Sequence, residues 1–246
     1  MKISFCTTCC NRLHQFRETL EENAAILDND PLLEWVVLNF RSSDGLHEYM
    51  LERLPELSER IVYAVDSSAG FWHAPTAKNI AMRLGRGDIL MSLDCDNFIR
   101  ETPRIIRESF AGDRNRVLQM WSGVFGDGTY GRIALGRDLF EALGGFDEEF
   151  SAMGYHDLDL IERGRALGAL AVKHTVGGGY AIRNSKEEGM KYSAPGSGSW
   201  LENVRKNEVR SLKNLQEKRL IANTGWNWGR ARVEIFRGGG RLLEAC

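Results

Sequence analysis

The sequence has no run of about 18 consecutive apolar residues, which predicts that it forms no transmembrane helix. Its first residues also lack the pattern of a signal peptide, because the apolar stretch after Lys2 is short and is interrupted by Thr7 and Thr8. Basic residues are not in excess either, since 32 Lys and Arg stand against 34 Asp and Glu, for a formal net charge of -2. We therefore expect no nucleic-acid partner, and a cytoplasmic location, either free or at the inner face of the membrane.

Cysteines are few, and their number is odd: they are Cys6, Cys9, Cys10, Cys95 and Cys246. Two of them are adjacent, and no second Cys/His pair lies at the spacing that a zinc site requires. Reduced thiols in a cytoplasmic protein are the simpler interpretation.

An alternation of strands and helices is present in the first part of this 246-residue chain. The predicted strands cover residues 2–8, 34–40, 60–65 and 88–93, and the helices between them cover 12–27, 46–57 and 75–84. This order is typical of an α/β fold with a mainly parallel sheet. Ligands of such sheets bind at the carboxyl ends of the strands. Those ends carry Thr7 and Thr8, Asn39, Asp66, and Asp94-Cys95-Asp96.

The second part of the chain has a different composition. Its predicted helices cover residues 102–110, 137–143, 157–167 and 200–220, and its predicted strands cover 117–121, 132–135 and 169–174. Residues 122–131 contain four glycines and predict a mobile loop. After Asn184 the chain becomes polar, and its tail carries Trp226, Trp228 and Phe236 among several arginines.

Two carboxylates follow the strand predicted at residues 88–93. Asp94 and Asp96 are spaced i, i+2, and extended residues with this spacing point to the same face. Two acids at the carboxyl end of a buried strand favour a hard divalent cation, which prefers oxygen ligands and can in turn hold a diphosphate. A solvated turn after the strand is the alternative when this segment is considered alone.

Four motifs occur in a recognisable order: Ala77-Lys78-Asn79, then Gly87 to Asp96, then Gly144-Gly145-Phe146-Asp147-Glu148, then Gly154 to Leu160. In order and spacing they resemble the GT-A glycosyltransferases, particularly the large inverting family 2. The second half also resembles the catalytic half of the β-1,4-galactosyltransferases. The resemblance covers roughly Ile3 to Glu188.

The resemblance implies a GT-A fold, which is Rossmann-like with a mainly parallel central sheet flanked by helices, followed by a C-terminal helical extension. It implies a catalytic domain over residues 1–188, with a nucleotide-binding half (1–100) and a half for the acceptor and the base (101–188), and a loop and helical extension over 189–246. It also implies metal-dependent, inverting transfer of a sugar from a nucleotide donor, a UDP-sugar, to an acceptor hydroxyl. The acceptor classes left open are a glycan, a lipid-linked glycan, a peptide and a small molecule.

Donor-site roles follow from the same resemblance. Asp96 would bind Mn²⁺ or Mg²⁺ directly, and Asp94 would face the ribose and the surroundings of the metal. The third metal ligand is either Asn184, which stands where the galactosyltransferases have a histidine, or His174 nearby. The nucleotide-binding candidates are Thr7, Thr8, Arg12, Asn39, Asp66, Lys78, Asn79, Asp94 and Cys95. Asn79 is expected to contact the ribose or the metal-motif loop, and the Cys95 side chain to point into the core.

Asp157 matches the general base of the similar enzymes, which removes the proton of the acceptor hydroxyl. The competing interpretation is a helix cap, because Asp is common at helix amino termini. His156 stands where the family often has Glu, and with Gly154, Tyr155 and Trp121 it is a candidate contact for the donor or acceptor sugar. The aromatic residues expected to offer a stacking surface for a sugar are Trp72, Trp121, Phe125 and Tyr130.

Other functions remain open at this stage. A non-catalytic nucleotide-sugar or glycan binder is the main alternative, because His156 and Asn184 depart from the family pattern. A sugar-nucleotide pyrophosphorylase is disfavoured, because the loop after the first strand contains no glycine. The tail is expected to pack on the core, with peripheral membrane contact or packing against a partner subunit, as in a homo-oligomer, as further interpretations.

Overall fold

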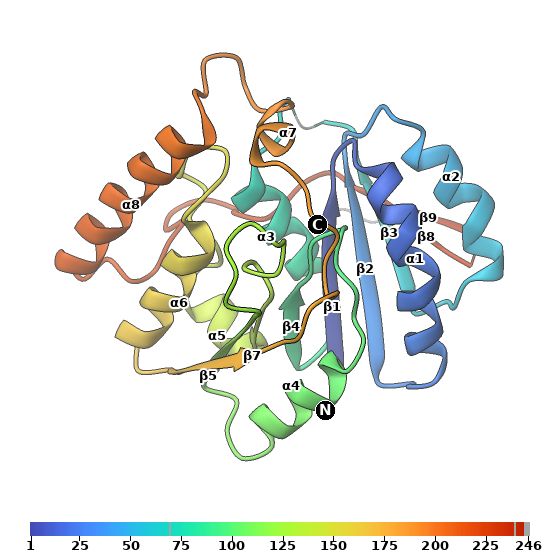
Figure 1. Cartoon of the computed structure of the whole chain (residues 1–246), viewed down its shortest axis with the longest axis horizontal. Coiled ribbons are helices and arrows are strands. Elements are labelled where there is room, and N and C mark those ends of the chain that lie inside the picture. The colour runs from blue at the N-terminus through green and yellow to red at the C-terminus, as the bar shows by residue number, and fades with distance from the viewer. Residues whose placement is uncertain (69, 239, 244–246) are drawn as a thin grey trace.

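The computed structural model describes residues 1–68, 70–238 and 240–243 (Figure 1), so Cys246 lies outside the described residues. The strands are β1 (Ile3–Cys9), β2 (Leu33–Phe40), β3 (Ile61–Asp66), β4 (Ile89–Ser92), β5 (Arg116–Trp121), β6 (Ile133–Gly136), β7 (Leu170–Thr175), β8 (Glu234–Arg237) and β9 (Gly240–Leu243). The helices are α1 (Leu13–Asp28), α2 (Leu46–Arg53), α3 (Ala74–Leu84), α4 (Thr102–Phe110), α5 (Arg137–Ala142), α6 (His156–Ala166), α7 (Lys186–Met190) and α8 (Trp200–Gln216), with a 3-10 helix η1 (Leu54–Glu56).

One sheet contains all of these strands, in the order β7-β5-β6-β4-β1-β2-β3-β8-β9. The neighbours β4, β1, β2 and β3 are parallel, which confirms the α/β prediction for the first part of the chain. On one side β6 joins β4 and β5 by antiparallel pairing, and β7 returns parallel to β5. Because the four central strands run the same way, their carboxyl ends meet at one edge of the sheet.

Helices cover both faces of the sheet. Residues of α1, α2 and α4 share one apolar core with strand residues such as Phe5 and Trp35. Residues of α3, α5 and α6 share a second core with residues such as Val36 and Leu90. Alternate residues of β2 therefore face opposite cores, and all eight of them are buried, as expected for a parallel strand covered on both faces.

The C-terminal region differs from the prediction in two places. The helix predicted over 200–220 ends at Gln216, and the arginine-rich tail contributes β8 and β9, two strands that were not predicted. β8 pairs antiparallel with β3 and thereby extends the sheet. The tail also packs on the core as expected, since the Trp228 ring meets the Phe140 ring at a centroid distance of 5.5 Å. Among the described residues, no helix combines the length and the apolar character needed to cross a membrane.

Candidate functional site

A buried lysine connects two of the predicted functional acids. Lys78 lies on α3 and is only 5% exposed. Its Nζ donates a hydrogen bond to Ser92 Oγ at 2.9 Å and lies 3.1 Å from Asp94 Oδ1 and 3.5 Å from Asp157 Oδ1. Burial lowers the pKa of Lys78, but the charges of Asp157 and Asp94 outweigh it and raise that pKa, so the ammonium stays protonated. The structure thus joins two acids that are far apart in the sequence.

The second acid of the metal motif is buried beside two amides. Asp96 is 4% exposed, and it accepts hydrogen bonds from Asn97 Nδ2 at 2.6 Å and from Asn184 Nδ2. The backbone carbonyl of Asp96 accepts a hydrogen bond from the N–H of Ile182 at 2.8 Å, so the backbone shortly before Asn184 contacts the metal motif. Burial and the neighbouring Asp94 raise the pKa of Asp96 to about 6.

These residues fit a hard divalent cation by their chemistry. Asp94 and Asp96 supply carboxylate oxygens, and the Asn184 amide supplies an oxygen after a half-turn of its terminal group. Burial is the larger cause of the raised pKa of Asp96, and a cation would offset both the burial of its charge and the repulsion from Asp94. His174 instead lies on β7 opposite Met120. Within the described residues no three or more His, Cys, Asp and Glu side chains are grouped for metal binding. Asn184 stays a candidate third ligand because its side chain contacts Asp96.

Asp157 lies in the first turn of α6, but the helix is capped by Tyr155 and no side-chain hydrogen bond makes the cap. Asp157 is thus not the cap residue itself, but its place in the first turn of α6 keeps the helix-terminus interpretation open. Burial raises the pKa of Asp157, but the interactions with His156 and with the Lys78 ammonium outweigh it and lower that pKa, so the group is an ionised carboxylate at neutral pH. A carboxylate in this state accepts a proton, as a general base must.

His156 is buried against Asp157. Its Nδ1 accepts a hydrogen bond from the N–H of Gly154 at 3.2 Å, and its Nε2 lies 3.5 Å from Asp157 Oδ2. Burial lowers the pKa of His156, which favours the neutral ring. With Nδ1 as an acceptor, the neutral ring carries its proton on Nε2, facing the carboxylate.

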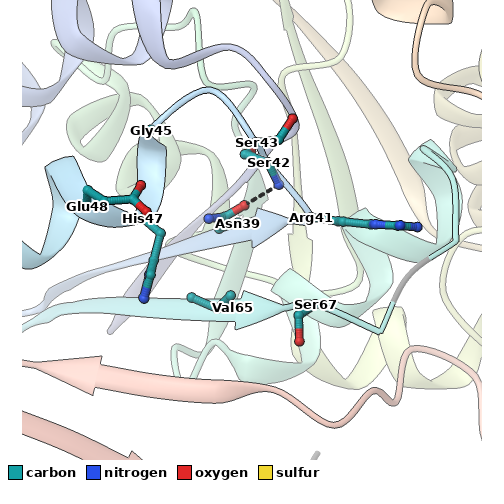
Figure 2. Close-up of a pocket in the computed structure, with 9 residues that line it drawn as sticks. All are labelled: Asn39, Arg41, Ser42, Ser43, Gly45, His47, Glu48, Val65 and Ser67. Carbon is teal, nitrogen blue, oxygen red and sulfur yellow. Dashed lines mark hydrogen bonds between the residues drawn. The ribbon is translucent and has the colours of Figure 1, made fainter.

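A cavity of about 500 Å³ opens at the carboxyl ends of β2 and β3 (Figure 2). Its lining includes Asn39, His47 and Glu48. The Asn39 side chain is fixed there, since its Oδ1 accepts from the N–H of Ser42 at 2.8 Å and its Nδ2 donates to Tyr63 Oη at 2.8 Å. Asp66 ends β3 beside this cavity, and its Oδ1 accepts hydrogen bonds from the N–H and the hydroxyl of Ser68.

Three predicted nucleotide contacts have other roles in the structure. The Asn79 amide is hydrogen-bonded to the segment Gly144-Gly145-Phe146-Asp147-Glu148. Its Oδ1 accepts from the N–H of Phe146, and its Nδ2 donates to the Phe146 carbonyl and to Glu148 Oε1. The Thr7 hydroxyl accepts from Trp35 Nε1 inside the core. Cys95 is 8% exposed and packs in the same core, as expected for its side chain. Asn79 and Thr7 thus pair with residues distant in the sequence, whereas Cys95 lies in the core as expected.

The remaining candidates border the site. Thr8 is 7% exposed near the end of β1, and Arg12 follows that strand and donates to Glu188 Oε2 at 3.2 Å. The Trp121 ring lies against two aromatic neighbours, with centroids 4.8 Å from Phe125 and 5.2 Å from Tyr130. Phe125 is 79% exposed, so this cluster presents an aromatic surface to solvent.

Two cations that act on the acids, Lys186 and Arg132, were not predicted from the sequence. The charge of Lys186 lowers the pKa of both Asp96 and Asp157, so this residue of the unpredicted helix α7 lies close to the site. Arg132 is fully buried and donates to Asn97 Oδ1 and Thr102 Oγ1. For Lys186, the available signal in the sequence was its position directly after Asn184 and Ser185. For Arg132, no local sequence pattern indicated a place near the acids.

The lowered pKa of Asp157 predicts how stability depends on pH. A carboxyl group whose pKa is lower in the folded than in the unfolded protein stabilises the fold at pH values above its unfolded pKa of 3.8. This contribution is lost as the pH falls through the pKa of the folded state. Asp157→Asn should therefore reduce the free energy of unfolding at neutral pH, and the difference from wild type should shrink below about pH 3.8. Urea unfolding at a series of pH values measures it. A difference that persists unchanged in acid would mean that the ionised carboxylate does not stabilise the fold.

No protein-family model and no curated protein matches this chain. Solved structures do match. The mannosyltransferase PcManGT from Pyrobaculum calidifontis, in complex with GDP-Man and Mn²⁺, aligns with a TM-score of 0.54 and 20% identity over 71% of this chain and 55% of its own. S. aureus TarS with UDP aligns at 0.55 and 14% identity over 78% and 63%. The catalytic domain of Drosophila β1,4-galactosyltransferase 7, in complex with xylobiose, aligns at 0.55 and 11% identity over 83% and 79%.

This chain thus spans 55% of the mannosyltransferase and 63% of the TarS structure. At these identities the likeness concerns the fold, and it agrees with the parallel central strands flanked by helices. The chain has the GT-A fold of the glycosyltransferases.

Proposed function

We propose that this protein is a metal-dependent, inverting glycosyltransferase that moves a sugar from a nucleotide diphosphate donor, a UDP-sugar, to an acceptor hydroxyl. The observation that carries the proposal is the buried Lys78, which lies between Asp94 of the candidate metal motif and the candidate base Asp157. The two halves of a transfer site, one for the leaving group and one for the attacking group, are thus adjacent. Bound GDP-Man and Mn²⁺ in PcManGT and bound UDP in TarS support a nucleotide-sugar donor.

On the donor side, Asp94, Asp96 and Asn184 would hold Mn²⁺ or Mg²⁺, and the cavity beside Asn39 would accept the nucleobase. When bound there, the cation supplies Lewis-acid stabilisation of the leaving diphosphate. The charge of Lys186 acts on Asp96 in the direction that lowers its pKa, so this residue is a candidate for a second positive charge near the phosphates.

On the acceptor side, Asp157 removes the proton of the acceptor hydroxyl as its oxygen attacks the anomeric carbon. Its ionised state at neutral pH matches this role. Lys78 holds one carboxylate oxygen and His156 faces the other, so the base is fixed in orientation. The aromatic surface of Trp121, Phe125 and Tyr130 is the candidate platform for a sugar ring.

The test is release of nucleoside diphosphate with Mn²⁺ from a panel of UDP- and GDP-sugars, with glycan, lipid-linked, peptide and small-molecule acceptors. We expect one donor class to give release that requires the metal and an acceptor. Saturable binding of a nucleotide-sugar without release from any donor would instead support a non-catalytic binder.

Gly131 offers a probe of the space between the acids. A Cβ atom at this position would lie 3.1 Å from Asp94 Oδ2, 3.3 Å from Asp157 Oδ2 and 3.3 Å from Lys78 Nζ. Gly131→Ala should therefore lower kcat/KM by about tenfold or more, because small displacements of reacting groups are costly. Its melting temperature should match that of the control Gly112→Ala, whose added methyl would meet no atom within 4 Å. Unchanged kcat/KM would place the reaction elsewhere.

A further inference from the structure

Helix α8 packs on the domain with a polar face. Asn203, Asn207 and Ser211 are each at most 1% exposed, whereas Val209 on the same helix is 67% exposed and Leu201 is 49% exposed. Soluble helices ordinarily bury their apolar side. Of the polar atoms on the inward face of α8, Asn203 Oδ1 and Ser211 Oγ have no hydrogen-bond partner, whereas both polar atoms of the Asn207 amide are hydrogen-bonded. Figure 1 shows α8 as the outermost helix on one side of the molecule, and it packs against α6, the helix that carries Asp157.

Asn207 makes three hydrogen bonds to the segment that leads into α6. Its Oδ1 accepts from the N–H of Ser151 at 2.6 Å, and its Nδ2 donates to the carbonyls of Ser151 at 3.2 Å and Gly154 at 2.8 Å. Both N–H donors of the Asn207 amide and its carbonyl oxygen are hydrogen-bonded to this backbone segment.

The backbone held by Asn207 is strained. Gly154 has φ +98°, and the next residue, Tyr155, has φ +61° although it is not a glycine. Left-handed conformations of bulky residues cost free energy and persist where the surroundings impose them. A Cβ atom on Gly154 would lie 2.6 Å from Val204 Cγ2 of α8, so the helix also closes on this turn sterically.

The strained turn orients the side chain beside the base. The carbonyl of Gly154 is held by Asn207, while its N–H donates to His156 Nδ1. That bond places the proton of the neutral ring on Nε2, 3.5 Å from Asp157 Oδ2. Asn207, Gly154, His156 and Asp157 therefore form a continuous series of contacts from α8 to the candidate base.

We propose that Asn207 is a positioning residue for Asp157: by fixing the Gly154–Tyr155 turn it sets the orientation of His156 and, through it, of the carboxylate. The inference rests on the proposed function, in which Asp157 is the base. It assigns the C-terminal extension a role in the reaction. Other residues of the extension hold the start of the same segment, since Asn223 Nδ2 donates to the carbonyls of Gly144 and Phe146.

The test compares Asn207→Ala with Asn203→Ala, a matched control. Asn203 lies one turn earlier on the same face, is equally buried, and donates to the carbonyls of Ser197 and Ser199, away from the base. We expect Asn207→Ala to lower kcat by about tenfold to a hundredfold with the donor KM changed less than about twofold, because misplacement affects the chemical step. Asn203→Ala should leave both constants near wild type at a similar loss of melting temperature. Equal effects of the two variants on kcat, or none, would overturn the proposal.

Asn207→Asp serves if the alanine variant does not fold. It keeps the side-chain shape and the acceptor for Ser151 but replaces the donor to Gly154, and we expect the same fall in kcat. Wild-type turnover at least tenfold above this variant supports the proposal, whereas equal turnover contradicts it.

A readout without turnover separates this inference from the proposed function. Amide hydrogen exchange at Gly154 and His156 should be faster in Asn207→Ala than in wild type and unchanged in Asn203→Ala. If the wild type releases no nucleotide from any donor, the proposed function fails, while the exchange data still report whether Asn207 holds the turn. Unchanged exchange in Asn207→Ala would overturn the positioning role.

Discussion

Asp157→Asn should lower kcat by about 10²–10⁴-fold while nucleotide binding stays near wild type, because an amide cannot accept the proton of the acceptor hydroxyl. The substitution keeps the size of the side chain, and its neighbours Lys78 and His156 remain in place. Steady-state kinetics with the donor identified by the panel, together with calorimetric binding of UDP, measure the two effects separately.

The control addresses the alternative that an acid in the first helical turn acts only through the helix dipole. Asp138 occupies the first turn of α5 as Asp157 occupies that of α6, so Asp138→Asn removes a comparable charge at a comparable place. We expect Asp138→Asn to retain wild-type kcat. An Asp157→Asn variant with full turnover would show that another group is the base.

Lys78→Met should destabilise the fold by about 3 kcal/mol and remove most of the turnover, because it leaves Asp94 and Asp157 without their shared cation. The Asp157 side chain is 15% exposed and that of Asp94 is 39% exposed, so we expect the loss at the lower end of the range for broken buried pairs. Equilibrium urea unfolding of the variant, with turnover measured at saturating Mn²⁺, tests both parts.

Lys173→Met is a matched control on the exposed edge of β7 and should change the free energy of unfolding by less than about 0.5 kcal/mol. A Lys78→Met variant as stable as this control would mean that solvent, and not Lys78, compensates the two carboxylates.

The parts of the site predicted correctly from sequence depend on local pattern. The apolar run before Asp94 marks a buried strand, which the structure places at Ile89–Ser92. Both acids follow its end, but in a turn closed by the N–H of Asn97 and the carbonyl of Asp94, and not in the extended backbone that the i, i+2 argument assumed. The helix predicted over residues 157–167 likewise lies at His156–Ala166 in the structure. The carboxyl ends of parallel strands meet at one edge, so their convergence followed from the α/β order alone.

The parts that escaped prediction depend on partners distant in the sequence. Asn79 resembles a ligand contact locally, yet it satisfies the backbone of Phe146. The inward face of α8 carries asparagines such as Asn207, and an apolar-periodicity rule would place that face in solvent. β8 is a strand because it pairs with the free edge of β3, and nothing in its four residues requires that pairing.

The central claim is that Asp94 and Asp96 on one side and Asp157 on the other form one transfer site. A crystal structure with UDP and Mn²⁺, with the metal located by its anomalous signal, tests this most directly. We expect Mn²⁺ bound by Asp96 and the diphosphate, with Asn184 or Asp94 beside it, uracil in the cavity next to Asn39, and the diphosphate facing Asp157. UDP bound away from Asp96, or Mn²⁺ held by residues outside this group, would contradict it.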